Sequence, residues 1–379
     1  MVLTRLGEIG VRRFMREYWQ RRPVLIRAAL PDFAPPVDRK RMFELAASAD
    51  VESRLIVRDG ARWSLRHGPI PRRSLPPLAQ PRWTLLVQGL DQADASAHEL
   101  LARFRFVPDA RLDDLMASFA TDGGGVPAHV DNYDVFLLQA YGRRRWRISR
   151  QHDQRLQPGM PLKLLADFRP TREWVLEPGD MLYLPPGVAH EGVAVGACVS
   201  YSIGFRTPTW QELHDPWLAR FAEGTRLDGR YADPGQRVTA HPGELPNAMI
   251  SRTHAALSRI RPTRAHTARF LLEHLSEPKP EVVFRRPQHQ PSPGVFARAV
   301  RRQGVILDAR SRMLYGNPGV ALNGELFEVA AGLRPALHAL ADRRRLDGDS
   351  IARAPAALVP LLREWLLAGW LHFDREKAP

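Results

Sequence analysis

The sequence has little cysteine, little lysine and no long apolar run. Its 379 residues contain one cysteine, Cys198, which excludes both a disulfide framework and a cysteine-based metal site. No stretch approaches the roughly 18 apolar residues that cross a bilayer, and the N-terminal segment lacks the apolar centre of a signal peptide. We therefore expect a soluble, cytoplasmic protein without a membrane partner.

Lysine is scarce because arginine supplies most of the positive charge. Lysine and arginine together number 55 against 41 acidic residues, which gives a net charge of +14. The lysines are Lys40, Lys163, Lys279 and Lys377. A chain of this charge is drawn to RNA-rich assemblies by non-specific electrostatics. The same charge would repel a basic target, so a pocket for such a target needs local acidic groups.

The length and the changes in composition predict three domains. A chain of 379 residues is long for a single compact domain. Residues 1–208 carry mostly strand and turn patterns, residues 209–277 are mainly helical, and a third unit follows the prolines at 278 and 280. We place the domain boundaries at 208/209 and 277/278.

The first domain begins with alternating helices and strands. The periodicity predicts a helix over 5–22, a strand over 23–30, a helix over 42–47, a hairpin over 51–68, a strand over 83–91 and a helix over 94–106. The hairpin turns at Asp59-Gly60, a pair that favours a two-residue turn.

The most informative stretch covers residues 123–147. His129 and Asp131 are two residues apart, and residues at that spacing on a strand point to the same face. His190 follows the turn-rich run LPPGVAH and precedes an apolar run. Two histidines and one carboxylate form the facial set that holds Fe(II) while leaving coordination positions open.

Chance must be weighed, because the chain contains 13 histidines. His152-Asp153 and His214-Asp215 are pairings of this kind, and neither has the strand spacing. Three features favour His129 and Asp131: the glycines at 123–125, the apolar alternation over 133–140 that extends the strand, and a turn at Gly142 followed by a second strand, Arg143 to Ile148.

Arg144 lies in that second strand. Alternation puts Arg144 and Trp146 on one face and the three neighbouring arginines on the other. A guanidinium is well shaped to bind a carboxylate through two hydrogen bonds, such as the distal carboxylate of a 2-oxoacid. The alternative is that all four arginines meet solvent.

Short strands and turns continue to His190. EPGD is a tight turn, MLYL an alternating strand, and PPGVAH a turn that delivers the histidine. Such elements are typical of a jelly roll or cupin core. Cupin isomerases commonly place two histidines and a glutamate in their first motif, so aspartate at 131 favours the oxygenase set.

The runs HVDNYDVFLLQ, GRRRW, LPPGVAHEG and YSIGFR resemble the JmjC-type ribosomal oxygenases, most of all the bacterial branch that hydroxylates an arginine of a large-subunit ribosomal protein. The resemblance implies an enzyme that uses Fe(II), 2-oxoglutarate and dioxygen. It also implies a mainly β fold: a double-stranded β-helix with flanking helices, a helical dimerisation region and a C-terminal winged-helix-like domain.

The resemblance also assigns roles to individual residues. His129, Asp131 and His190 would be the iron ligands. Arg144 would hold the 5-carboxylate of 2-oxoglutarate, with Ser118 bonded to the same cosubstrate. Ser200 stands where some relatives have asparagine, so its contact with the cosubstrate is open. For an arginyl substrate, Asp122 and Asp134 are candidate partners of the guanidinium by position alone, with a structural role as the alternative.

The rest of the chain predicts association and a further domain. A helix over 211–224, a loop over 227–246 and two helices over 247–277, split near Pro262, need partners for their apolar faces, so we expect a homodimer. Strands and turns over 304–324 and helices over 331–346 and 355–373 resemble a winged helix. Residues 343–345 form its one dense basic cluster, so we favour a structural or docking role over specific nucleic-acid binding.

Other functions stay open at this stage. The iron motif does not distinguish an arginine hydroxylase from a JmjC oxygenase that acts on another residue, such as a histidine hydroxylase or a lysine demethylase. A cupin isomerase or small-molecule binder with another divalent metal is a second class. A winged-helix nucleic-acid-binding protein whose barrel senses a ligand is a third.

Overall fold

The computed structural model describes residues 2–31, 33–60, 62–234, 236–237, 241 and 243–374. The chain divides into two compact units, Met1–Thr207 and Pro208–Pro379, and each is described by itself. No helix in the described part of the chain is both long enough and apolar enough to cross a bilayer.

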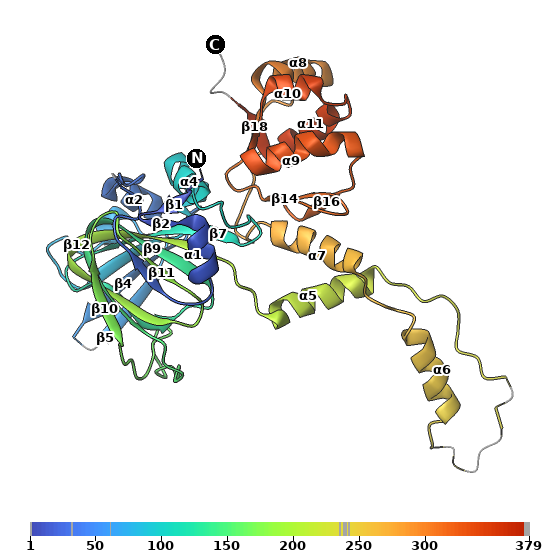
Figure 1. The fold of residues 1–379 in the computed structure, drawn as a ribbon, viewed down its shortest axis with the longest axis horizontal. Helices are drawn as coiled ribbons and strands as arrows, with labels where there is room; N and C mark the ends of the chain where they lie inside the picture. Colours follow the sequence, from blue (N-terminus) through green and yellow to red (C-terminus); the bar gives the residue numbers. More distant parts are fainter. Residues whose placement is uncertain are drawn as a thin grey trace. The chain divides into compact units, whose positions relative to one another are not determined.

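The first unit is built on one large antiparallel sheet. Figure 1 shows the strands of this unit gathered together. Their order is β3-β11-β9-β12-β7-β6-β4-β5, with β10 added to β9 and β8 added to β12. The strands are β3 (Val24–Ile26), β4 (Ser53–Asp59), β5 (Arg62–His67), β6 (Trp83–Val87), β7 (Leu112–Ala120), β8 (Gly125–Val130), β9 (Asp134–Ser149), β10 (Arg172–Leu176), β11 (Met181–Leu184) and β12 (Ala189–Phe205).

The two long strands β9 and β12 each belong to two layers. The first half of β9 pairs with β11 and its second half with β10, while the first half of β12 pairs with β8 and its second half with β7. β9 bends at Gly142, where φ is +62° and a Cβ atom would lie 2.2 Å from the Ala197 carbonyl oxygen. Only glycine fits there. Two layers that share their long strands make the predicted double-stranded β-helix.

Strands β9 and β11 are buried on both faces, as their apolar alternation predicted. Phe136 and Tyr183 point into a large core that also includes the N-terminal helices. Val135 and Leu182 point the other way, into a smaller core that includes Trp146. The metal-site histidines and Arg144 lie on strands that border this second core.

The N-terminal segment differs from the prediction. Residues 5–22 form two short paired strands, β1 (Arg5–Leu6) and β2 (Ile9–Gly10), and only then a helix, α1 (Val11–Glu17). The apolar spacing concealed a turn at Gly7, whose φ is +51°. The hairpin of β4 and β5 is confirmed. The remaining helices are α2 (Arg39–Ala46), η1 (Arg72–Ser74), α3 (Leu90–Ala93) and α4 (Ala95–Ala102).

The second unit begins with exposed helices and ends in a compact fold. Its helices are α5 (Trp210–Glu223), α6 (Asn247–Leu257), α7 (Arg264–Ser276), α8 (Pro293–Gln303), η2 (Ala331–Leu333), α9 (Arg334–Arg343), α10 (Gly348–Arg353) and α11 (Leu358–Ala368). Its strands are β13 (Val305–Leu307), β14 (Met313–Tyr315), β15 (Val320–Leu322), β16 (Glu325–Phe327), β17 (Arg345–Leu346) and β18 (Leu371–Phe373). Of the loop predicted over 227–246, residues 235, 238–240 and 242 lie outside the described residues.

Helix α7 packs with the C-terminal elements, although the sequence analysis grouped it with the dimerisation helices. It contacts β14, β15 and β16. The Ser276 hydroxyl accepts a hydrogen bond from the Gly324 amide at 3.1 Å, and Arg269 pairs with Glu328 at 3.0 Å. The prolines at 278 and 280 therefore do not separate α7 from the fold that follows.

Two arginines of the basic cluster at 343–345 form hydrogen bonds or ion pairs within the second unit. Arg344 ends α9 in the left-handed conformation, and its guanidinium donates to the carbonyl oxygens of Ser311 and Asp308. Arg345 pairs with Asp374 at 3.5 Å. These contacts agree with a structural role for the cluster.

Candidate metal centre

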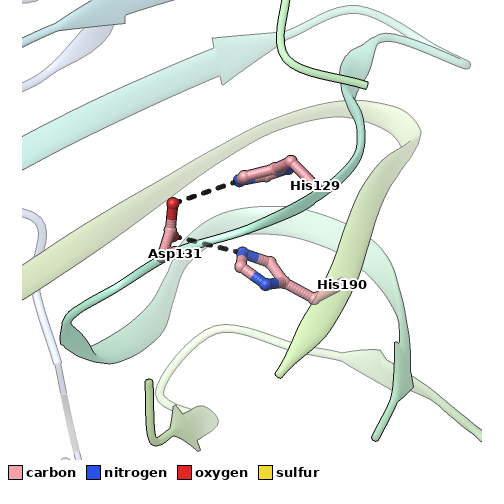
Figure 2. A group of neighbouring side chains, drawn as sticks. All are labelled: His129, Asp131 and His190. Carbon is pink, nitrogen blue, oxygen red and sulfur yellow. Dashed lines mark ion pairs between the residues drawn. The ribbon is translucent and has the colours of Figure 1, made fainter. Parts of the chain in front are cut away.

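Two side chains from neighbouring strands and one from the loop after β8 converge on one point. Figure 2 shows the imidazoles of His129 and His190 facing the carboxylate of Asp131. His129 Nε2 lies 3.7 Å from Asp131 Oδ1, and His190 Nε2 lies 3.5 Å from Oδ2. Among the described residues, these three form the one group of three or more His, Cys, Asp or Glu side chains placed to hold an ion.

The local backbone differs from the predicted continuous strand. His129 is on β8, directly opposite His190 on β12, but Asp131 lies one residue beyond the end of β8. The chain bends over residues 131–133 before β9 begins. The Gly187 amide donates to the Asp131 carbonyl oxygen at 2.9 Å, so the loop before His190 supports this bend.

Backbone carbonyls fix the protonation of both imidazoles. His129 Nδ1 lies 2.8 Å from the Pro127 carbonyl oxygen, and His190 Nδ1 lies 3.0 Å from that of Val188. A carbonyl oxygen can only accept, so each Nδ1 carries a proton, and in the neutral ring it is Nε2 that presents a lone pair towards Asp131. Nitrogen lone pairs and carboxylate oxygens repel one another at this distance, and a cation bound between them would remove that repulsion.

Burial keeps His190 neutral. Removal from water lowers the pKa of His190 to about 4, with a further lowering by His129 and an opposing effect of Asp131. At neutral pH the ring is therefore a neutral ligand that need not lose a proton before it binds a metal.

Tyr133 is a residue of this centre that the sequence analysis missed. Partial removal of its hydroxyl from water, followed by the charge of the nearby Asp131 carboxylate, raises the pKa of Tyr133, although 39% of the residue is exposed. The phenol therefore stays protonated beside the carboxylate. The one signal in the sequence is that Tyr133 follows Asp131 by two residues, a spacing that puts side chains on one face of a strand. Because the chain bends here, that rule does not apply.

Arg144 is a buried cation that pairs with no acid in the described part of the chain. Both of its Nη atoms donate to Ser118 Oγ at 3.1 Å, and its Nε lies 3.4 Å from Cys198 Sγ. Its side chain is almost fully buried, and no carboxylate of the described residues pairs with it. A buried guanidinium without a counter-charge is costly unless an anion binds it, so this site fits a carboxylate ligand.

Trp146 lies between Arg144 and the metal centre. Its ring centroid is 6.0 Å from that of His190 and 5.8 Å from the Arg144 guanidinium carbon. The indole N–H is buried and has no hydrogen-bond partner among the described residues. An orphaned donor between a carboxylate-binding arginine and a metal centre fits an oxygen-rich cosubstrate that spans the two.

Ser200 is occupied within the protein. Its hydroxyl donates to Gln139 Oε1 at 2.8 Å, and the Gln139 amide nitrogen is held by the carbonyl oxygens of Tyr141 and Gly142. Ser200 therefore offers a ligand only the lone pairs of its oxygen. The asparagine found in some relatives would also offer an N–H.

The two candidate substrate carboxylates have different surroundings. Asp122 is exposed, and its Oδ1 accepts from the Gly196 amide at 2.8 Å. Asp134, in contrast, is fully buried, so the expectation that it lies at the mouth of the site is wrong. Its oxygens accept from four internal donors: Gln20, Arg111, Tyr183 and Thr207.

Comparison with known proteins places this geometry in a family. The JmjC domain family matches residues 99–213, and the ROXA-like winged helix family matches residues 254–372. The chain is 34% identical over 367 residues to the ribosomal protein uL16 3-hydroxylase of Escherichia coli, which covers 95% of this chain and 97% of the relative. It is 35% identical over 206 residues to a probable ribosomal oxygenase of Haemophilus influenzae, covering 53% and 51%.

Solved structures agree over nearly the whole chain. An X-ray structure of E. coli YcfD superposes with a TM-score of 0.86 at 29% identity, covering 98% of this chain and all of that one. A structure of YcfD, described as a ribosomal oxygenase in complex with cobalt and 2-oxoglutarate, matches with a TM-score of 0.83 at 30% identity, covering 98% and 99%.

Proposed function

This chain belongs to the JmjC-domain ribosomal oxygenases, and from that premise we propose that it hydroxylates an arginine side chain of a large-subunit ribosomal protein. The observation that carries the proposal is the convergence of two Nε2 lone pairs and one carboxylate on a single point. The name of the E. coli relative supports the ribosomal substrate. Family membership favours an oxygenase over a cupin isomerase.

The three converging side chains would hold Fe(II). His129 and His190 would supply nitrogen ligands and Asp131 an oxygen ligand, a set that leaves coordination positions open for other ligands. Bound iron and 2-oxoglutarate together supply one chemistry: dioxygen is consumed, the cosubstrate becomes succinate and carbon dioxide, and one oxygen atom enters a C–H bond. The Tyr133 hydroxyl, whose pKa is raised by the nearby Asp131 charge, would donate a hydrogen bond that orients this carboxylate.

Arg144 and Ser118 would bind the distal carboxylate of 2-oxoglutarate. Arg144 is already held by Ser118, so the guanidinium loses little conformational freedom when the anion arrives. The Trp146 indole N–H would donate to the same cosubstrate, and its ring would exclude water between Arg144 and His190. Ser200 would contribute at most an acceptor.

Asp122 is the acidic group that we assign to the substrate guanidinium. It is exposed, and one of its oxygens remains available beside the bond from Gly196. A carboxylate there offsets the repulsion that a chain of net charge +14 exerts on a basic target. A ribosomal substrate also agrees with the expected cytoplasmic location.

The experiment measures cosubstrate turnover and peptide modification together. The purified chain is incubated with Fe(II), 2-oxoglutarate and arginine-containing peptides from large-subunit ribosomal proteins. We expect succinate to form in step with the gain of one oxygen atom on an arginine. Peptides with lysine or histidine in place of that arginine serve as controls. Modification of those controls instead would indicate the demethylase or histidine-hydroxylase alternative.

We further propose a homodimer formed through the helices at 209–277. Helices α5 and α6 contain no buried residue, and Ile250 and Leu257, one heptad apart on α6, are 49% and 56% exposed. Light scattering should give twice the chain mass of 42.8 kDa. Ile250→Glu should reduce the dimer, whereas Ala255→Glu on another face should not. A wild-type monomer at micromolar concentration would contradict the proposal.

A further inference from the structure

Two adjoining cavities in the first unit form a basic groove that the oxygenase chemistry does not use. One has a volume of about 580 Å³ and the other about 830 Å³. Arg150 and Gln151 line both, so the cavities adjoin at these residues. We call the combined surface the arginine groove, after its five arginines: Arg21, Arg22, Arg150, Arg169 and Arg172.

The charge of the arginine groove is of one sign. Among the described residues that line the two cavities there is no aspartate or glutamate. Arg169 pairs with Asp167 at 2.6 Å, but the other four arginines form no ion pair with any described residue. All five are exposed. Four neighbouring guanidinium groups without counter-charges repel one another, and a polyanion would relieve that repulsion.

Two of these guanidinium groups are fixed in position without being neutralised. Arg150 donates to the carbonyl oxygen of Arg21 at 3.2 Å, and Arg22 donates to that of Glu17 at 3.3 Å. Carbonyl oxygens hold the side chains and leave their full charge. Arginines held in this way lose less entropy on binding a phosphate than freely rotating side chains do.

Aromatic side chains lie among the arginines. Tyr18 and Trp174 line the larger cavity, and the Arg22 guanidinium lies over the Tyr18 ring at 4.7 Å. Basic side chains interleaved with aromatic rings are the usual surface for single-stranded nucleic acid, because phosphates contact the cations while bases stack on the rings.

The groove adjoins the candidate metal centre. Gly187 and Val188 line the smaller cavity. The amide of Gly187 and the carbonyl of Val188 also hold Asp131 and His190, respectively. A polyanion in the groove would therefore touch the loop that supports two of the metal-site residues.

We propose that the arginine groove binds single-stranded RNA. That the groove binds a polyanion is inferred from its charges and cavities alone. RNA as the source of the phosphates rests on the proposed function, since a large-subunit ribosomal protein is normally surrounded by ribosomal RNA. The enzyme would then recognise RNA and protein together.

The test is direct binding of a fluorescein-labelled single-stranded RNA of about 12 nucleotides, within the usual site size of such grooves. Anisotropy is measured with the full chain, without Fe(II) or 2-oxoglutarate. The result is therefore independent of whether the turnover assay succeeds. Four phosphate contacts predict that affinity falls about 50-fold between about 50 and 200 mM salt.

Matched variants separate the groove from general charge. Arg150→Gln with Arg172→Gln leaves about two contacts, so the same salt change should lower affinity only about 7-fold. Arg301→Gln with Arg302→Gln removes the same charge from exposed positions on α8 and should keep the wild-type salt dependence. Arg150→Lys with Arg172→Lys should retain most of the binding, because the charge remains.

Three outcomes would overturn the proposal. The first is no RNA binding by the wild type at about 50 mM salt, where electrostatic contacts are strong. The second is an equal loss in the α8 control, which would indicate diffuse attraction. The third is tighter binding of a polyglutamate peptide than of RNA, with the groove variant losing both, which would assign the groove to an acidic protein.

Discussion

The indole ring of Trp146 lies directly against the α-carbon of Gly192, so closely that a methyl group at position 192 would come within 2.7 Å of the ring. The two residues are directly opposite each other on β9 and β12. Trp146 can therefore lie between Arg144 and His190 only because residue 192 has no side chain.

Gly192→Ala should displace Trp146 and disturb both ends of the proposed cosubstrate site. We expect a stability loss of about 1–3 kcal/mol from overpacking, together with weaker 2-oxoglutarate binding. Chemical denaturation and calorimetry measure the two effects. Gly10→Ala is the control, because φ there is −63° and nothing lies within 4 Å of the added methyl. Equal behaviour of the two variants would contradict the packing argument.

Arg144→Met should separate cosubstrate binding from folding. Removing a buried cation that lacks a counter-charge should leave the stability of the cosubstrate-free protein unchanged or raise it. The same change should weaken 2-oxoglutarate binding by about 10- to 150-fold, because a charged hydrogen-bonding partner is lost. Thermal melting with and without 2-oxoglutarate measures both. The exposed Arg143→Met is the control, and a destabilised Arg144→Met with an intact melting shift would refute the assignment.

Asp134 and Asp122 should respond in opposite ways to the same substitution. Asp134→Asn removes a buried charge that accepts from four donors, including Arg111 at 3.0 Å, so we expect a stability loss of about 3 kcal/mol. Asp122→Asn should keep stability and raise the KM for the arginyl peptide. Denaturation and peptide kinetics on both variants check this, and the reverse pattern would return Asp134 to the substrate site.

Tyr133→Phe should loosen the metal centre without abolishing it. The substitution removes the hydroxyl that we propose orients Asp131, and loss of such a supporting group typically lowers metal affinity about 10- to 100-fold. Fe(II) affinity under anaerobic conditions is the measurement. Tyr141→Phe, on the exposed part of β9, is the control for metal affinity, and indistinguishable affinities in the two variants would remove Tyr133 from this role.

Short sequence motifs predicted the residues of the metal site better than the roles of the residues around it. The spacing of His129 and Asp131 and the alternation around Arg144 named side chains that the fold brings to one region. The same stretch holds Asp131 and Asp134 only three residues apart. What makes Asp134 structural is its contact with Gln20 and Arg111, which are distant along the chain and which no local pattern reveals.

Two details of the backbone were predicted wrongly for a related reason. The helix predicted over 5–22 and the strand predicted through Asp131 both rested on periodicity, which continues across a turn. Gly7 and the bend at 131–133 interrupt it. The bend is stabilised by Gly187, more than fifty residues later in the printed sequence, so only the folded chain specifies it.

The central claim is that three side chains hold one iron ion, and metal stoichiometry tests it most directly. The full chain is equilibrated with Fe(II) under anaerobic conditions, dialysed and analysed for iron. We predict one iron per chain in the wild type and in the control His214→Ala, whose exposed imidazole contacts Asp215 at 2.9 Å. We predict loss of that iron in His129→Ala, Asp131→Ala and His190→Ala. Full iron content in any of these three variants would contradict the account.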